Sequence, residues 1–326
     1  MSKEEKRIDI TKPLWDQSTF FGRVRHFAFV TDPTTIFVTD AQLDKAKVLY
    51  EQYRDGKEPS GTSLKDVIYA KKLYESSFHP DTGERQNVFG RMSFQVPGGM
   101  ILTGAMLQFY RTSAAVIFWQ WVNQSFNALV NYTNRNAKSP VTTTQLVAAY
   151  ISATASALVT ALGCKKYLAK RASPLLQRYV PFAAVAAANC VNIPLMRQGE
   201  ILNGIAVTDE NGKKVTESKI AAVKGISQVV SSRIFMAFPG MTIMPLIVER
   251  IQHKPWFANN PKLHAPFQVL AVGGFLIFMV PIACGLYPQL CSISPETLKR
   301  FEPEAYEKLQ KNSSKIPEKL YFNKGL

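Results

Sequence analysis

The sequence predicts an all-α, polytopic membrane protein with about five transmembrane helices and a helical, water-soluble N-terminal region. Three observations support this fold class. Beyond about Val96 the chain contains long apolar runs, and a membrane span needs about 20 predominantly apolar residues. Short basic connections separate these runs, as is typical of membrane loops. Residues 1–91 instead carry balanced basic and acidic side chains, so the mean hydropathy of −0.05 averages over two unlike parts.

Capping residues and apolar spacing predict two helices within residues 1–91. Thr39 and Asp40 can cap a helix that extends to about Arg54, and Ser63 with Asp66 resembles the capping box of a second helix. The expected apolar faces are Leu43, Ala46, Tyr50 and Tyr53 in the first helix, and Val67, Ala70, Tyr74 and Phe78 in the second.

An earlier segment combines an apolar face with basic residues. The apolar face contains Phe20, Phe21, Val24, Phe27 and Ala28, beside Arg23, Arg25 and His26. Two interpretations stay open: an amphipathic helix that rests on the membrane surface, or a helix that packs on the two helices that follow.

Five apolar runs are expected to form a transmembrane bundle within residues 92–290. They cover residues 96–121, 141–163, 175–196, 226–248 and 265–290, and residues 291–326 are expected to form a polar C-terminal tail. The second and fifth runs contain no Asp, Glu, Lys or Arg, whereas the first contains Arg111 and the fourth Arg233. A central arginine costs about 2.5–3.5 kcal/mol on insertion scales, which a long apolar run tolerates. The second and third runs are rich in Ala and Ser, which allow helices to approach closely.

The formal net charge of +15 suggests either nucleic acid or an anionic membrane surface as a partner. Its distribution favours the membrane, because the connection after the second run is purely basic, with Lys165, Lys166, Lys170, Arg171 and Arg178. A lipid bilayer is therefore the expected partner, and nucleic acid is not. Five spans would place the two termini on opposite sides of the membrane.

The third run contains the pattern most typical of a substrate site. Asn189 and Asn192 share a helix face, and Pro194 cannot donate a hydrogen bond to the carbonyl of Cys190. Arg197 and Gln198 would lie at the mouth of the resulting polar pocket, as broken helices do in transporters. The alternative is a structural kink whose asparagines bond neighbouring helices.

Other polar or helix-breaking residues in the runs are further candidates. Gln108, Arg111 and Arg233 could contribute to the substrate site, because a guanidinium binds a carboxylate through a planar pair of donors. Both arginines could equally extend to the membrane surface or bind lipid phosphate. Pro239 and Gly240 interrupt the fourth run and could serve as a gate or a structural break.

A polar loop joins the N-terminal helices to the first run. It contains His79, Pro80, Asp81, Thr82, Gly83 and Glu84. Pro80 and Gly83 flank a tight turn, so a structural turn is one interpretation, and a gate or ion-sensitive latch is another. One His and two carboxylates in this loop could also bind a metal, but the scattered Cys and His residues give no ligand cluster, so neither a metal site nor a cofactor is predicted.

Several motifs across the whole chain resemble the sideroflexin family. They are residues 15–20 (WDQSTF), 31–33 (TDP), 79–84 (HPDTGE), 119–127 (WQWVNQSFN), 131–135 (NYTNR), 189–198 (NCVNIPLMRQ) and 321–326 (YFNKGL), and the expected branch is that of sideroflexin-1 and sideroflexin-3. This resemblance implies a multi-pass protein of the mitochondrial inner membrane that moves serine into the matrix to supply one-carbon metabolism. Alanine and cysteine are further expected cargoes. Glu4 and Glu5 argue against a cleavable presequence.

The expected transport is facilitated or by exchange, because no Asp or Glu lies within the five runs to relay protons or couple ions. A membrane scaffold or assembly factor for inner-membrane complexes is the alternative function. No enzyme is predicted, since the sequence lacks nucleophile-elbow, phosphate-loop and zinc-protease motifs. The oligomeric state stays open.

Overall fold

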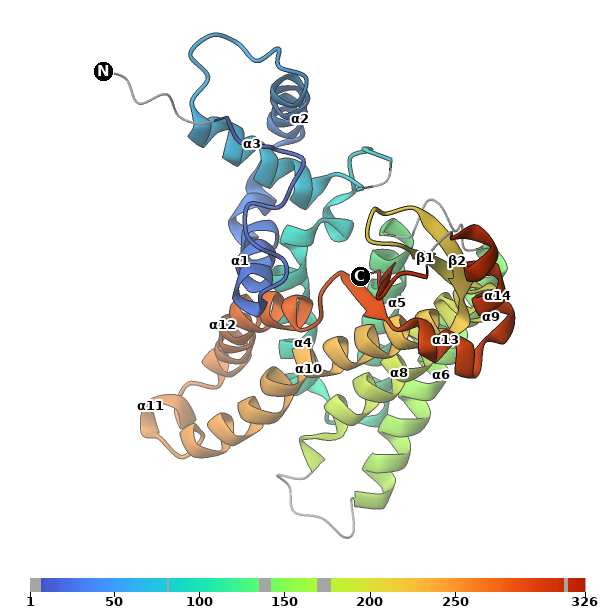
Figure 1. Ribbon diagram of the computed structural model, residues 1–326. Coiled ribbons are helices and arrows are strands. Elements are labelled where there is room, and N and C mark those ends of the chain that lie inside the picture. The colour runs from blue at the N-terminus through green and yellow to red at the C-terminus, as the bar shows by residue number, and fades with distance from the viewer. Residues whose placement is uncertain (1–6, 81, 135–141, 169–176, 314–315, 326) are drawn as a thin grey trace.

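The computed structural model describes residues 7–80, 82–134, 142–168, 177–313 and 316–325. Most of this part of the chain is helical (Figure 1). Helices near the N-terminus form one end of the molecule, long apolar helices form its body, and a small sheet lies beside the body. Outside these ranges lie Glu4, Glu5, Asp81, Arg135, Lys170, Arg171 and Leu326, together with the first residues of the second and third runs.

The N-terminal end contains α1 (Phe20–Val30), α2 (Asp40–Arg54) and α3 (Leu64–Ser77), with short 3-10 turns at Pro33–Phe37, Val88–Gly90 and Met92–Phe94. Both predicted caps are confirmed: the Thr39 amide donates to Gln42 Oε1 at 3.0 Å, and the Asp66 amide donates to Ser63 Oγ at 3.2 Å. The predicted apolar face of α2 is buried against α3. The sequence therefore determined these two helices locally.

Helix α1 packs mainly against the C-terminal end of a long apolar helix, α12 (His264–Gly285), with a smaller contact to α3. Arg23 is buried there, and its Nε donates to the Gly285 carbonyl at 2.8 Å. Phe21, on the opposite face of α1, is 74% exposed. The expectation that this helix packs on the two helices that follow is thus met only by the small contact with α3, because its main partner is α12. Contact of the exposed face with a membrane surface stays a prediction.

A pH-dependent contribution to stability is expected from His26 in α1. Burial, and secondarily the positive charge of Lys71, lower the pKa of His26 below its ordinary value. The unfolded chain therefore binds the proton more readily, so His26 should destabilise the N-terminal helices as the pH falls through about 6.5. The nearby carboxyl of Glu75 acts oppositely, because burial raises its pKa and acidification relieves the cost of its charge.

Comparison with His26→Gln separates the two effects. Amide hydrogen exchange in α1 and α3 should lose protection between about pH 7 and 5 in the wild type, relative to the variant at each pH. An equal loss of protection in the wild type and the variant would show that His26 does not contribute.

Six helices form the body and alternate in direction between its two ends. They are α4 (Gln95–Phe109), α5 (Ser113–Thr133), α6 (Thr143–Leu168), α8 (Val180–Met196), α10 (Lys219–Ile251) and α12. Among the described residues, three segments are long and apolar enough to cross a membrane: Thr143–Tyr167, Lys219–Ile251 and Pro261–Gly285. Helix α8 is apolar but shorter. The expectation of about five spans is therefore not confirmed in number.

The first predicted span is wrong as a single helix. The run at 96–121 is divided into α4 and α5, which pack against each other, and Arg111 lies in the turn between them. Thr112 starts α5 by accepting a hydrogen bond from the Ala115 amide at 3.1 Å. Arg111 is consequently exposed in a turn and is not within a span.

The prolines do not interrupt their helices. Helix α8 continues through Pro194 to Met196, α10 continues through Pro239 and Pro245, and α12 continues through Pro281. The broken third span is therefore not observed. Proline removes one helical hydrogen bond, but tight packing of a membrane helix against its neighbours tolerates that loss.

Helices α6 and α8 pack closely through small residues, as expected for the second and third runs. Four alanines at four-residue spacing lie on the buried face of α6: Ala149, Ala153, Ala157 and Ala161. Ala184 and Ala188 are buried on α8. Ala at these positions allows the two backbones to approach each other.

A four-stranded antiparallel sheet contradicts the all-α prediction. Its order is β2–β1–β4–β3, formed by β1 (Ile205–Thr208), β2 (Lys214–Ser218), β3 (Leu290–Ile293) and β4 (Leu320–Asn323). Helices α13 (Pro295–Phe301) and α14 (Pro303–Asn312) accompany it, and α9 (Gln198–Asn203) precedes β1. The sheet buries one face in a core of Val207, Val215, Leu298, Leu309, Leu320 and Phe322. The expected polar tail, 291–326, is therefore largely folded.

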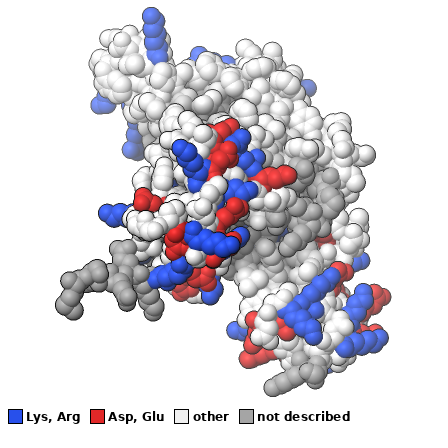
Figure 2. All heavy atoms as spheres, turned by 90° about the horizontal axis from the view of Figure 1, so that it is seen from above, with Lys and Arg blue, Asp and Glu red and all other residues white. Residues whose placement is uncertain are grey.

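The N-terminal helices and the sheet lie at the same end of α12. Helix α1 bonds to Gly285, the last residue of α12, and β3 begins only five residues later. If α12 crosses a membrane, both parts lie on one side of it, which differs from the expectation that five spans place the two termini on opposite sides. Figure 2 looks onto the molecule from above and shows intermixed basic and acidic side chains, as is typical of a water-exposed surface.

Candidate functional site

A cavity of about 520 Å³ lies at the end of the body opposite the N-terminal helices. It is bounded by the end of α4, the start of α8, the later part of α10, the short helix α11 (Pro255–Ala258) and the start of α12. Its lining residues are Leu107, Gln108, Tyr110, Arg111, Lys165, Gln177, Arg178, Val180, Pro181, Met244, Pro245, Val248, Gln252, Phe257, His264 and Gln268. The volume lies within the range of about 300–1,000 Å³ that is typical of small-molecule sites.

The cavity has a positive electrostatic character. Arg111, Lys165 and Arg178 line it, and none of its described lining residues is an Asp or Glu. Lys165 Nζ donates to the Arg111 carbonyl at 2.6 Å, which ties the end of α6 to the turn between α4 and α5. These cations come from the last turn of α6 and from the connections between helices, where charged side chains avoid the cost of a place within the membrane.

Arg178 is held by α10. Its Nη1 lies 2.9 Å from Glu249 Oε2, an ion-pair distance without hydrogen-bond alignment, and it also donates to the Pro245 carbonyl at 3.3 Å. Nη2 donates to Gln252 Oε1 at 3.2 Å. These three contacts leave Arg178 partly neutralised and fixed in direction, so it shapes the wall of the cavity.

Neutral polar groups complete the lining. Gln268 Nε2 donates to Gln108 Oε1 at 2.7 Å, which joins α12 to α4, and His264 Nε2 lies 2.9 Å from the Phe257 carbonyl. Carboxamides offer both donors and acceptors. The cavity therefore combines cationic donors for an anionic group with carboxamide oxygens for an ammonium group.

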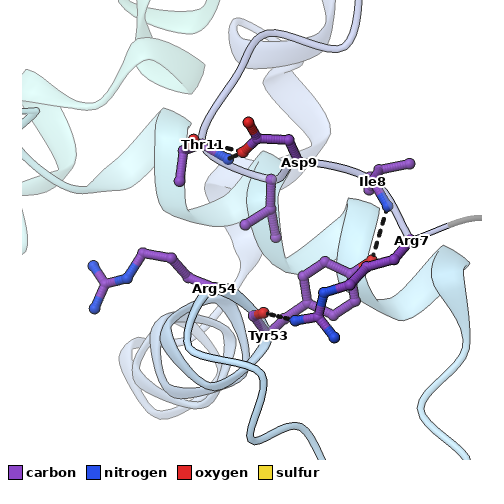
Figure 3. Close-up of a pocket in the computed structure, with 7 residues that line it drawn as sticks. Arg7, Ile8, Asp9, Thr11, Tyr53 and Arg54 are labelled. Atoms are coloured by element: carbon purple, nitrogen blue, oxygen red, sulfur yellow. Dashed lines mark hydrogen bonds between the residues drawn. The ribbon is translucent and has the colours of Figure 1, made fainter.

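A second, smaller pocket of about 320 Å³ lies between the first described residues and α2 (Figure 3). Its polar groups already bond to one another: the Ile8 amide donates to Tyr53 Oη at 3.1 Å, and Asp9 Oδ1 accepts from the Thr11 amide at 3.1 Å. Arg7 donates to the Tyr53 carbonyl and lies over the Tyr53 ring. Because these groups are satisfied, we assign the candidate site to the larger cavity.

The structure separates the residues that the sequence grouped into one site. Gln108 and Arg111 line the cavity, whereas Asn189, Asn192, Pro194, Arg197 and Gln198 lie toward the far end of α8. Val180 at the cavity and Arg197 are 17 residues apart, roughly 25 Å at the helical rise.

At that far end the arginines have other partners. Arg197 Nε donates to Glu200 Oε1 at 3.0 Å, and its Nη1 donates to the Lys324 carbonyl at 2.7 Å. Arg233 interacts electrostatically with Lys324, so it too lies near the chain segment after β4. Neither arginine lines the cavity, and Pro239 and Gly240, in the middle of α10, do not line it either.

The described residues of the 79–84 loop, on either side of Asp81, close a tight turn at the N-terminal end. The His79 amide donates to the Glu84 carbonyl and the Gly83 amide to the His79 carbonyl, both at 2.8 Å. Gly83 has φ +66°, and its carbonyl accepts from Lys47 Nζ at 2.7 Å. This geometry favours the structural-turn interpretation, and a gating role stays a prediction.

Sequence reasoning missed several residues of the cavity: Lys165, Gln177, Arg178, Gln252, His264 and Gln268. Two of them, Lys165 and Arg178, belong to the basic connection after the second run, so the sequence did contain a signal for them. That connection was interpreted only as a sign of membrane topology. The others follow from three-dimensional packing of helix ends, which spacing along the chain does not reveal.

Long apolar helices around a polar cavity define a multi-pass membrane protein. The family model for sideroflexins matches residues 9–326. Sideroflexin-2 of Drosophila melanogaster is 58% identical over 327 residues and sideroflexin-2 of Homo sapiens 55% over 326, each with 100% of both chains covered. Sideroflexin-1 of Homo sapiens is 51% identical, with 98% of each chain covered. No solved structure matches the chain.

The chain belongs to the sideroflexin family. The two sideroflexin-2 relatives are more similar to it than the sideroflexin-1 relative is, whereas the motifs led us to expect the branch of sideroflexin-1 and sideroflexin-3.

Proposed function

We propose that this protein is a carrier for small amino acids, with serine as the principal cargo, and that it does not act as an enzyme. The observation that carries the proposal is the cavity, which presents cations and carboxamides without a lining carboxylate. An amino acid has one carboxylate and one ammonium group, and both match this lining. None of the described lining residues is an Asp or Glu, so the cavity does not select an amino acid with a basic side chain. A small neutral amino acid is compatible with this lining.

In this proposal, Arg111 binds the carboxylate of the amino acid. Its side chain has no hydrogen-bond or ion-pair partner among the described residues, so its donors are available. The lining carboxamides Gln108 and Gln268, which bond to each other, provide oxygens for the ammonium group. Arg178 orients the wall through its contacts with α10.

Family membership supports the proposed location and cargo. We place the protein in the mitochondrial inner membrane, where it would move serine, and also alanine and cysteine, into the matrix to supply one-carbon metabolism. The names of the relatives do not specify a cargo, so the choice of serine depends on the resemblance, and the lining adds only that it suits a zwitterion.

Transport is proposed to be facilitated or by exchange. None of the described residues that line the cavity is an Asp or Glu, and Glu249 on α10 lies beside Arg178. The described lining therefore offers no carboxylate to relay protons or couple ions.

Uptake into liposomes that contain the purified protein tests the proposal. We expect saturable uptake of radiolabelled serine that alanine and cysteine inhibit, and that continues after pH and sodium gradients are dissipated. Uptake that requires either gradient would contradict the uncoupled mechanism. A folded protein that moves none of these amino acids would contradict the carrier function and favour a scaffold.

A further inference from the structure

Helix α5 carries a stripe of carboxamide side chains that the cavity does not account for. The stripe consists of Gln120, Asn123, Gln124, Asn127, Asn131 and Asn134. Successive members are one, three or four residues apart, which places them on one side of the helix. The Asn131 side chain lies outside the described part of the chain, and the other five are described.

The first three members of the stripe face the interior of the protein, whereas Asn127 is half-buried and Asn134 is exposed. Gln120 is 0%, Gln124 2% and Asn123 7% exposed, whereas the aromatic side chains of Phe118 and Trp121 are about half exposed. A helix of a soluble protein has the opposite arrangement, with its polar face in water. An apolar outer face and a polar inner face instead suit a membrane helix that borders a polar interior.

The stripe begins at the candidate site. Gln120 Nε2 donates to Tyr110 Oη at 2.7 Å, and Tyr110 lines the cavity. One turn before Gln120, Val116 is fully buried in a cluster with Val180, which also lines the cavity. The first carboxamide of the stripe is therefore separated from the cavity by a single side chain.

The stripe ends at the N-terminal end of the molecule. Asn134 Nδ2 donates to the Gly90 carbonyl at 3.0 Å, and its Oδ1 accepts from Gln86 Nε2 at 2.8 Å. Gln120 and Asn134 are 14 residues apart, roughly 21 Å along the helix. The stripe thus connects the cavity at one end of the body with the N-terminal region at the other.

Two buried atoms of the stripe lack the partners that a purely structural role requires. Gln120 Oε1 and Asn123 Nδ2 have no hydrogen-bond partner among the described residues. Carboxamides that only join helices bond to side chains or carbonyls across the interface, and an unsatisfied buried group destabilises the fold. An acceptor and a donor one turn apart are complementary to an ammonium and a carboxylate, respectively.

We propose that the carboxamide stripe of α5 is the inner path of the transported solute, and that the Tyr110–Gln120 hydrogen bond separates it from the cavity in this conformation. This proposal rests on the carrier function. It assigns one class of substrate to the path, namely small polar solutes that are zwitterionic or neutral. The described stripe residues have no formal charge, so they exchange hydrogen bonds with such a solute without holding it tightly.

Cysteine accessibility tests the path independently of transport. In a background in which Cys164, Cys190, Cys284 and Cys291 are replaced by alanine, Asn123→Cys and Asn127→Cys should react with a charged methanethiosulfonate reagent in liposomes. Trp121→Cys and Leu129→Cys, on the outer face, are the matched controls and should react at least tenfold more slowly, because the reagent requires a hydrated thiolate. Equal or slower reaction at the stripe would overturn the proposal.

Serine uptake provides the second measurement. Gln120→Leu, which removes the carboxamide at nearly constant volume, should lower the uptake rate at least tenfold, and Tyr110→Phe, which removes the closing hydrogen bond, should raise it. Ser125→Ala is the control, since Ser125 bonds to Tyr150 on α6 and lies outside the stripe. Normal uptake by Gln120→Leu would overturn the path and leave the carrier function intact. Absence of uptake by the wild type would overturn the carrier function, and thiol reactivity would then decide whether the stripe is hydrated.

Discussion

Replacement of Arg111 by glutamine is expected to raise the KM for serine uptake about tenfold, with little change in the maximal rate. Arg111 lies in the turn between α4 and α5, at the rim of the cavity, where its guanidinium can bind a carboxylate. A hydrogen bond to a charged group contributes about 1.5–3 kcal/mol, and the exposure of Arg111 places it at the lower limit. A loss of about 1.4 kcal/mol corresponds to a factor of ten in affinity.

Two further variants make this result specific. Arg111→Lys keeps the charge but loses the planar pair of donors, so an intermediate KM is expected. Arg300→Gln removes an exposed arginine from α13, outside the cavity lining, and should leave the KM unchanged. An unchanged KM in Arg111→Gln, or an equal increase in Arg300→Gln, would show that Arg111 does not bind the substrate.

Replacement of Phe322 by alanine is expected to destabilise the sheet by about 3–5 kcal/mol, the usual cost of a large-to-small change in a packed core. Phe322 lies in β4, is 1% exposed, and packs in the core that α13 and α14 share with the sheet. The loss should appear as faster amide hydrogen exchange in all four strands, because β4 is the central connection between β1 and β3.

Tyr321→Ala is the matched control on the same strand. Its side chain points to the other face of the sheet and is only partly buried, so a clearly smaller change in exchange is expected. If Phe322→Ala leaves the exchange of β1 and β2 unchanged, residues 291–326 do not stabilise the sheet as described.

The N-terminal helices could be predicted from the sequence because their determinants are local. Thr39 and Ser63 cap helices whose apolar positions repeat at helical spacing, and the structure places both helix starts there. The division of the first apolar run was not predicted, since the short polar segment Arg111–Ser113 hardly interrupts the stretch and run length alone cannot distinguish one helix from two.

The sheet could not be predicted for a different physical reason. Each strand has only four or five residues, and Thr208 pairs with Tyr321, 113 positions later in the chain. Such short strands leave little periodicity, and their pairing is decided by tertiary packing. Residues 291–326 appeared polar because only one face of each element enters the core.

The candidate site was predicted only in part. Gln108 and Arg111 were recognised as polar residues of the first run, and they do line the cavity. The emphasis on Asn192 and Pro194 came from the assumption that proline opens the helix, but α8 remains continuous there. Lys165 and Arg178 enter the site because the ends of α6 and α8 meet the turn at Arg111, a juxtaposition that appears only in three dimensions.

The pairing of β1 with β4 also has a consequence for biogenesis. Helices α10 and α12 separate β2 from β3 in the chain, so the sheet closes only after both helices have been synthesised and have adopted opposite directions. If either helix failed to insert, the β1–β2 hairpin and the β3–β4 pair would remain on opposite sides of the membrane. Each would then expose an unpaired strand edge, which chaperones and proteases recognise as a feature of misfolded chains. The small sheet thereby makes correct insertion of two membrane helices detectable outside the membrane.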